Sequence, residues 1–175
     1  MTAEGVFPKS AGDIAYASEI NVLYNINKLK DVTPTLPIGK SYAGLGTSEA
    51  WDTDPTDLDN TTDESFTTAT GVGVVTTTSG DKVSSIEWDL GANSLRTYLW
   101  AKFDFTEDSA GQLRFYGSVD GTTWFSVGTT ISANSNYNQQ VLTVPIKFRY
   151  FAIAVLAQTA GADTSTLKVY GVACY

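Results

Sequence analysis

An acidic segment offers the first candidate chemistry in this chain of 175 residues. The stretch WDTDPTDLDNTTDESF, residues 51–66, has no basic side chain and six carboxylates: Asp52, Asp54, Asp57, Asp59, Asp63 and Glu64. Oxygen donors at this density suit a hard cation such as calcium, which takes six to eight oxygen ligands and accepts backbone carbonyls among them. The alternative is a solvated acidic loop that binds nothing.

Aromatic and amide side chains offer a second candidate, a surface that recognises a sugar. They are Tyr42, Trp51, and Asn136 with Tyr137 in the Asn-rich segment 132–140, which we expect to be a loop. A sugar presents an apolar C–H face and a rim of hydroxyls, so exposed rings flanked by amides and carboxylates suit it. The alternative is that Trp51 packs across the bottom of a barrel and the Asn-rich segment only forms a turn.

The sequence lacks the side chains that most enzymes use for catalysis. There is no histidine, which removes the commonest general base and metal ligand, and the single cysteine, Cys174, reads as a small strand residue. Glu87 and Asp89 alternate around Trp88, which is typical of a solvated strand face rather than an acid/base pair. A formal net charge of −8 leaves no basic face for phosphates. We predict a protein that is not an enzyme and does not bind nucleic acid.

The elements that would position these residues are strands. Short segments that alternate or run apolar cover residues 72–78, 83–90, 98–105, 112–119, 140–144, 148–157 and 166–174. Asp120-Gly121 indicates a tight hairpin, since both positions tolerate positive φ. We predict an all-β fold, an antiparallel β-sandwich or jelly roll over residues 42–175. Its expected buried residues are Trp88, Phe103, Phe115, Trp124, Tyr150, Ile153 and Val169.

Four motifs follow one another in an order that resembles the discoidin, or coagulation-factor type C, domain. They are WDLG at 88–91, FYGSVDGTTW at 115–124, FRYFAI at 148–153 and LKVYG at 167–171. The resemblance covers residues 45–175 and implies a galactose-binding-like jelly roll. It also implies a structural calcium in the first loop, with Asp57, Asp59 and Thr62 as ligands. Two departures stand against it, because Ala152 replaces a frequent arginine and Thr166 replaces the glutamate that opens the last strand.

The N-terminal 33 residues have a different character. Apolar residues at spacings of three and four predict one short helix whose stripe is Ile20, Leu23, Ile26 and Leu29. Such a helix needs a partner, either the β domain or copies of itself, and a homotrimer is our first choice. Residues 34–41, with two prolines, are predicted to be a linker.

The N-terminal arm also decides the predicted function. Gly12-Asp13 and the run Ala17–Asn21 resemble a segment near the N-termini of phage tail-fibre and other virion appendage proteins. With no signal peptide and no apolar run of membrane-spanning length, we predict a non-enzymatic virion protein, a tail fibre, baseplate or decoration protein assembled in the host cytoplasm. Its partners would be its own copies, other virion proteins and a host-surface glycan. The alternative is a carbohydrate-binding module associated with a secreted glycan-acting enzyme.

Overall fold

The computed structural model describes residue 32 and residues 34–37, 40–43, 46–47, 50–63, 67–77, 81–132, 135–157 and 163–174. These residues form an antiparallel all-β sandwich with one short 3-10 helix, η2 (Leu58–Thr61). The predicted all-β jelly-roll class is confirmed. Among the described residues, no helix has the length and hydropathy that a membrane crossing requires.

Two long strands build both layers of the sandwich. β5 (Lys82–Thr106) and β8 (Ser135–Ala157) pair antiparallel from Lys82 with Ala157 to Phe105 with Ser135. The register shifts between Asp89 and Ser94, where Gly91 takes a φ of 77° and the strands turn from one layer into the other. The sequence predicted two separate strands in each of these regions, but the pairing continues through the bend.

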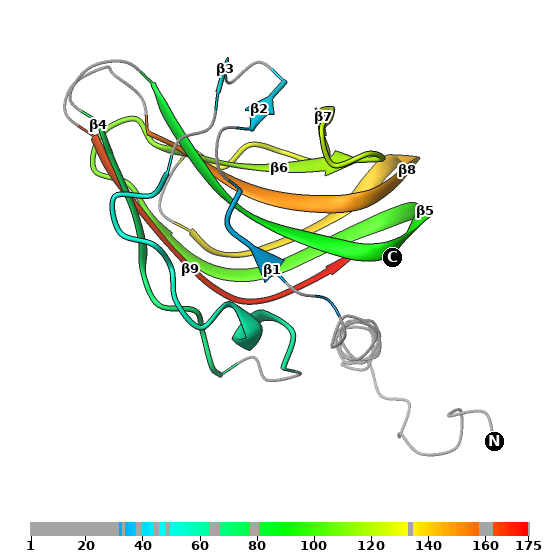
Figure 1. Ribbon diagram of the computed structural model, residues 1–175, viewed down its shortest axis with the longest axis horizontal. Helices are drawn as coiled ribbons and strands as arrows, with labels where there is room; N and C mark the ends of the chain where they lie inside the picture. The colour runs from blue at the N-terminus through cyan, green and yellow to red at the C-terminus, as the bar shows by residue number, and fades with distance from the viewer. Residues whose placement is uncertain are drawn as a thin grey trace, which may run out of the picture.

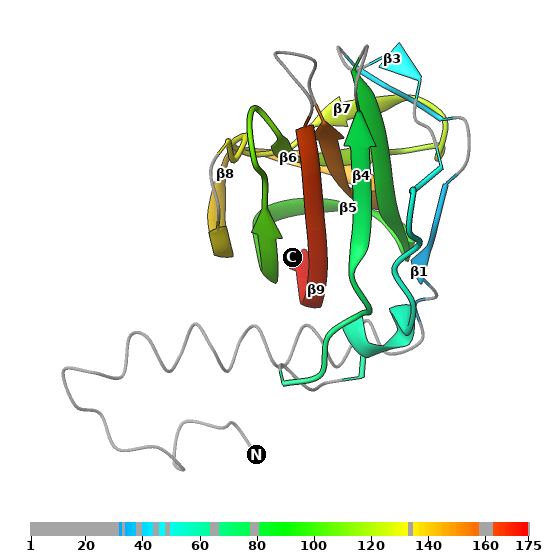
Figure 2. The ribbon, with the colours of Figure 1, turned by 90° about the vertical axis from the view of Figure 1, so that its left-hand side faces the viewer.

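Shorter strands extend the sheet on either side (Figure 1). The order is β4 (Gly73–Thr77), β9 (Asp163–Cys174), β5, β8, β6 (Gln112–Ser118) and β7 (Trp124–Ser126). One layer contains β4, β9 and the second half of β5, whereas the other contains the first half of β5, the second half of β8, β6 and β7. The layers lie face to face (Figures 1 and 2).

The main core fills the space between the layers. Alternate residues of each strand point inward, so apolar side chains with a period of two meet there. The confirmed core residues are Trp88, Phe103, Phe115, Ile153 and Val169. Trp88 also donates from Nε1 to Thr61 Oγ1 at 3.0 Å, which fastens η2 to the core.

A second buried cluster lies on the outer face of the layer that contains β6. It contains Tyr42, Val83, Tyr116, Trp124, Ala152, Ala154 and Leu156. Trp124 is therefore buried as predicted, but in this second cluster. Tyr150 is only half-buried at its border, so its predicted place in the core is wrong. The reason is the strand alternation, because Tyr150 and Ala152 point away from the face that carries Phe151 and Ile153.

The predicted linker contributes strands to this sandwich. β1 (Pro34–Thr35) pairs with Trp88 and Glu87 of β5, and Pro34 and Pro37 are buried. β2 (Ser41–Tyr42) pairs with β3 (Gly46–Thr47) in a separate small sheet. The predicted helix stripe, Ile20, Leu23, Ile26 and Leu29, lies outside the described residues.

Candidate functional site

Trp51 is a packing residue in this structure. Its ring is 7% exposed, belongs to the main core and lies against Gly73, where an added Cβ would approach Trp51 Cζ3 to 2.8 Å. Its Nε1 donates to the Ser85 carbonyl at 3.4 Å. The hypothesis of an exposed Trp51 platform is wrong, and the alternative, that this ring packs, fits the structure.

Tyr42 is buried as well, within a polar network on the outer face of β5. Its hydroxyl is hydrogen-bonded to Ser85 Oγ and donates to Glu87 Oε1 at 3.0 Å. Lys40 Nζ forms an ion pair with Glu87 Oε2 and lies 5.5 Å from the centre of the Trp124 ring. Burial raises the pKa of the Tyr42 hydroxyl far above its usual value, so it stays protonated. The network holds the β2 segment on the sheet.

This network corrects the interpretation of Glu87. Glu87 points to the outer face as expected, but it is only 4% exposed because the Lys40 and Tyr42 side chains cover it. Both carboxylate oxygens have partners within the protein, Lys40 for Oε2 and Tyr42 for Oε1. The expected solvated strand face is wrong at Glu87 and holds at Asp89, whose side chain is 39% exposed.

The acidic segment forms a turn around η2. Asp57 has a φ of 54° and its carboxylate accepts from Thr56 Oγ1 at 2.9 Å, while Thr62 Oγ1 donates to the Asp59 carbonyl at 3.1 Å. Although desolvation opposes it, hydrogen bonds from Lys82 and the Thr76 N–H lower the pKa of Asp52. Asp57 and Asp59 are exposed, and so are Asp52, Asp54 and Asp63 in the same segment.

The donor set of this turn fits the calcium site of the resemblance poorly. The Thr62 hydroxyl already serves the turn, and Thr166, at the glutamate position, shares a hydrogen bond of 2.6 Å with Thr106 Oγ1. Within the described ranges, no group of three or more His, Cys, Asp or Glu side chains could hold a metal ion. Calcium at Asp57, Asp59 and Thr62 therefore stays a prediction.

Asn136 and Tyr137 belong to a strand in the backbone of the structure. β8 begins at Ser135, so the predicted loop over 132–140 is wrong from that residue onward. Pairing with β5, in which Tyr137 is opposite Lys102, overrides the turn preference of the asparagines. The side chains of Asn136 and Tyr137 lie outside the described part of the chain.

A group that the sequence reasoning did not predict lies at the bend of the long strands. We call it the corner surface: Asp89, Val119, Asp120, Gly121, Arg149 and Tyr150. Arg149 donates from Nε and Nη2 to the two carboxylate oxygens of Asp89 at 2.7 and 2.6 Å. Its guanidinium carbon lies 4.9 Å from the centre of the Tyr150 ring. Arg149 holds the pKa of Asp89 below its usual range, so this carboxylate stays charged.

The turn between β6 and β7 completes the corner surface. Asp120 Oδ1 accepts from the N–H groups of Thr122 and Thr123 at 2.8 and 2.7 Å, which lowers the pKa of Asp120. Gly121, with a φ of 72°, lies so close to Tyr150 that a Cβ would be 3.3 Å from Cε2. The predicted hairpin is confirmed, but its connection runs over residues 119–123, and Gly121 rather than Asp120 takes the positive φ.

The corner surface is accessible to a ligand. The Arg149 side chain is 41% exposed and Val119 is 48% exposed. The planar Asp89–Arg149 pair offers hydrogen-bond donors and acceptors to hydroxyl groups of a ligand. The half-buried Tyr150 ring and the exposed Val119 side chain each offer apolar surface. In the sequence, Asp89 and Arg149 stand in motifs that we interpreted as strands, and only the pairing of β5 with β8 brings them together.

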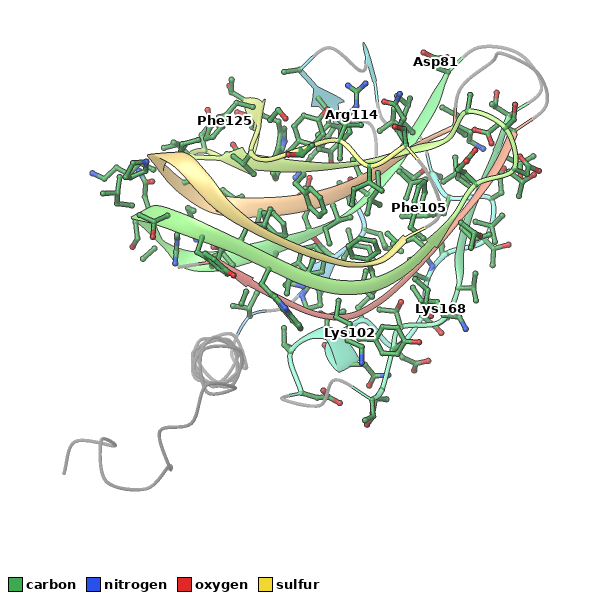
Figure 3. The ribbon with its side chains drawn as sticks, turned by 180° about the vertical axis from the view of Figure 1, so that it is seen from behind. Asp81, Lys102, Phe105, Arg114, Phe125 and Lys168 are labelled. Atoms are coloured by element: carbon green, nitrogen blue, oxygen red, sulfur yellow. The ribbon has the colours of Figure 1, made fainter. Side chains whose placement is uncertain are left out.

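A similar pair on the opposite layer provides a comparison. Lys102 Nζ lies 4.9 Å from the centre of the Tyr170 ring, and the Tyr170 hydroxyl donates to Asp104 Oδ2 at 2.7 Å. In Figure 3, Lys102 and Lys168 lie along the outer side of this layer, whereas Phe105 points between the layers. The two faces thus carry the same ring and cation chemistry in different surroundings.

Two solved structures that resemble this chain are modules of glycan-acting enzymes. Chitosan-binding module 1 of a chitosanase/glucanase from Paenibacillus sp. IK-5 is 15% identical with a TM-score of 0.52, over 86% of this chain and 98% of the module. CBM32-1 of a family 31 glycoside hydrolase from Clostridium perfringens is 17% identical with a TM-score of 0.52, over 87% and 99%. This chain shares their fold.

A third module with the same fold was solved with a sugar. It is the family 32 module of NanJ from C. perfringens in complex with galactose, 11% identical with a TM-score of 0.50, over 85% of this chain and 96% of the module. No protein-family model and no curated protein matches the sequence. The similarity to these solved structures supports the jelly-roll fold that the sequence predicted.

Proposed function

We propose that this chain is a non-catalytic glycan-binding module and that its corner surface contacts the sugar. The observation that carries the proposal is the fold, which spans nearly the whole length of modules named for chitosan binding or solved with galactose. The alternative that we kept from the sequence is thus better supported than the virion protein.

The corner surface is the part of the described chain that suits this function. A sugar ring needs an apolar contact and fixed hydrogen-bonding groups at its rim. The half-buried Tyr150 ring supplies the first, and the Arg149–Asp89 pair supplies the second with both side chains held in place. The rigid turn at Asp120 reduces the entropy that binding would cost.

The test is a titration of the full chain with chitooligosaccharides and with galactose, followed by calorimetry. We expect measurable binding of at least one sugar, and an Arg149→Ala variant should weaken it about tenfold or more, which corresponds to ~1.4 kcal/mol. Lys102→Ala is the matched control, because it removes a cation at the same distance from a tyrosine on the other face. Its affinity should stay within about twofold of the unchanged protein.

The outcomes separate the fold argument from the site argument. If neither the chitooligosaccharides nor galactose binds the unchanged protein, the glycan-binding proposal fails for both sugar classes. If a sugar binds and Arg149→Ala has the same affinity as Lys102→Ala, the corner surface is not the binding site. Melting temperatures of both variants exclude unfolding as the cause of lost binding.

The virion function remains a separate proposal that rests on the N-terminal resemblance. A glycan-binding jelly roll would serve equally in an appendage that touches a host surface, so the two proposals share the same domain. What distinguishes them is the N-terminal arm, residues 1–33, because only an appendage needs it for assembly.

A further inference from the structure

Two acidic side chains meet at the end of the sandwich opposite the corner surface. β9 begins there with Asp163, which pairs with Thr77 at the end of β4. The loop from β5 to β6 returns at the same end and carries Glu107 and Asp108. This end faces the viewer in Figure 2. The fold therefore places acidic residues of a distant loop beside the first residues of β9.

The loop of residues 107–111 lies closely against the start of β9. An added Cβ at Gly111 would lie 3.3 Å from Asp163 Oδ2. Asp108 Oδ1 accepts from the Thr164 N–H at 2.6 Å, and the Asp108 carboxyl group is also hydrogen-bonded to the Asp163 side chain. The loop is thus joined to β9 by one backbone hydrogen bond and by a pair of carboxyl groups.

A hydrogen bond between two carboxyl groups requires a proton on one of them, because two carboxylates are both acceptors. Asp108 is exposed, and the hydrogen bond from the Thr164 N–H, with a smaller contribution from Asp163, lowers the pKa of Asp108. Asp163 is 0% exposed beside that negative charge. Burial and a neighbouring negative charge both favour the neutral acid. The arrangement therefore favours Asp163 as the residue that keeps the proton.

The charges around the pair do not favour ionisation of Asp163. The neighbouring segments 78–80 and 158–162 contain no ionisable side chain. Lys82, at the start of β5, forms an ion pair with Asp52 at 2.6 Å. The other ionisable side chains that the structure describes in the loops of this end are acidic: Asp81, which Figure 3 labels, Glu107 and Asp108.

We propose that the Asp108–Asp163 pair is a pH-sensitive latch. Asp163 keeps its proton in the folded chain at neutral pH and donates it to Asp108, which attaches the loop of residues 107–111 to β9. Loss of this proton to the solvent leaves two carboxylates that repel each other, and the loop then separates from the strand. The latch lies at the end opposite the corner surface, so it is independent of the proposed sugar site.

The latch makes folding depend on pH in the direction opposite to that of an ion pair. An unfolded Asp side chain has a pKa of about 3.9, whereas the folded chain keeps the proton on Asp163 to a higher pH. The contribution to stability is complete below about pH 3.9 and is lost as the pH rises through the folded value. The chain has no histidine, and burial raises the pKa of Cys174 to about 12. Few other side chains therefore change charge between about pH 5 and pH 8.

The first experiment follows urea denaturation of the full chain between about pH 5 and pH 8. We expect the equilibrium constant for unfolding to rise with pH, by up to about tenfold per pH unit, because folding takes up one proton. Asp163→Asn should abolish this rise, since its amide N–H still donates to Asp108 but does not titrate. Glu107→Gln is the matched control, because it changes an acid to its amide on the same loop, and it should keep the rise.

Amide hydrogen exchange tests the latch in the unchanged protein. The Thr164 N–H donates to Asp108 in the latch, whereas the Thr122 N–H donates at 2.8 Å to Asp120, a carboxylate outside it. Exchange at Thr164 should accelerate relative to exchange at Thr122 as the pH rises, because release of the loop removes the acceptor of Thr164 alone. The ratio of the two rates cancels the intrinsic effect of pH on exchange.

The two experiments can each overturn the latch. An unfolding constant of the unchanged protein that does not depend on pH overturns it. It is also overturned by a rise that persists in Asp163→Asn, or by one that is lost in Glu107→Gln instead, because another group would then carry the proton. If Asp163→Asn does not fold, a ratio of the Thr164 and Thr122 exchange rates that stays constant with pH overturns the proposal by itself.

Discussion

At the scale of single residues, a buried polar network explains why Tyr42, which was predicted to bind a sugar, has a structural role. The Tyr42 hydroxyl reaches both Ser85 and Glu87, and Lys40 neutralises the same carboxylate. A buried carboxylate needs such partners, because without them its desolvation is not compensated. The network therefore holds the β2 segment on the sheet, and its residues are occupied rather than available to a ligand.

We expect Tyr42→Phe to lower the free energy of unfolding by about 1–3 kcal/mol. The change leaves Glu87 Oε1 and Ser85 Oγ without the phenol, and a buried group that loses its partner costs about this amount. Urea denaturation followed by tryptophan fluorescence measures it. Tyr170→Phe, which removes a hydroxyl from the exposed outer face, should cost less. Equal losses in the two variants would contradict the buried network.

The Asp89–Arg149 pair makes a prediction about pH. Hydrogen bonds from Arg149 lower the pKa of Asp89 in the folded state, so the pair stabilises the fold above the unfolded pKa of about 3.9. This contribution is lost as the pH falls through the lower, folded value. Melting temperatures between about pH 5 and pH 2 should therefore fall less steeply in Asp89→Asn than in the unchanged protein. A parallel decline in both would show that the pair has no effect on stability.

Residue types in the sequence predict the core better than they predict exposure. Ile153, Phe115 and Val169 stand at alternating positions, and the structure buries all three. Trp51 has the same type as a sugar-stacking residue, but its burial depends on Gly73, which is distant in sequence. Single-residue chemistry therefore cannot tell a platform from a packing residue.

At the scale of elements, the strands were predicted but their continuity was not. The polar stretch from Gly91 to Thr97 separates two apolar runs, so the pattern indicates two strands. In the structure, β5 continues through this stretch because β8 pairs with it on both sides of the bend. Pairing partners lie far away in sequence, which is why a local pattern does not reveal them.

The turn between β6 and β7 supports a prediction at Gly121. Gly121→Ala should lower the free energy of unfolding by about 1 kcal/mol from its φ of 72°, with an additional loss from the Cβ contact at 3.3 Å to Tyr150. Gly91→Ala is the control, since Gly91 has a similar φ of 77° and open space around its Cβ position. The difference between the two variants in urea denaturation isolates the contact with Tyr150. Equal losses of unfolding free energy in the two variants would show that the Tyr150 ring moves aside without an energetic cost.

At the scale of the whole molecule, the candidate sites depend on topology. The corner surface joins residues from β5, from β8 and from the β6–β7 turn. The discoidin-like motifs predicted the fold that brings these distant residues together. They did not predict which side chains meet, because that depends on register and on where the long strands bend.

The extent of the sandwich changes how the N-terminal arm must be tested. β1 pairs Pro34 with Trp88, and proline is tolerated there because a short edge strand needs few donors. A shortened chain that begins at Pro37 would lose β1, so it would damage the sandwich together with the arm. A chain that begins at Val32 removes the predicted helix and keeps β1 together with Val32, which packs against the core.

We expect the full chain to be a trimer and the chain beginning at Val32 to be a monomer in light scattering. In a helical bundle, burial of Ile20, Leu23, Ile26 and Leu29 would stabilise the assembly by about 1.5–3 kcal/mol per side chain. Ordering the arm costs a comparable amount of conformational entropy. Assembly should therefore weaken on dilution, and the measurement needs a concentration series. The melting temperature of the Val32 chain should match the dilute full chain, whereas a chain beginning at Pro37 should melt lower because β1 is gone. Monomers at every concentration in both the full and the Val32 chains would show that the arm does not assemble the protein, and the function of a free glycan-binding module would then be favoured.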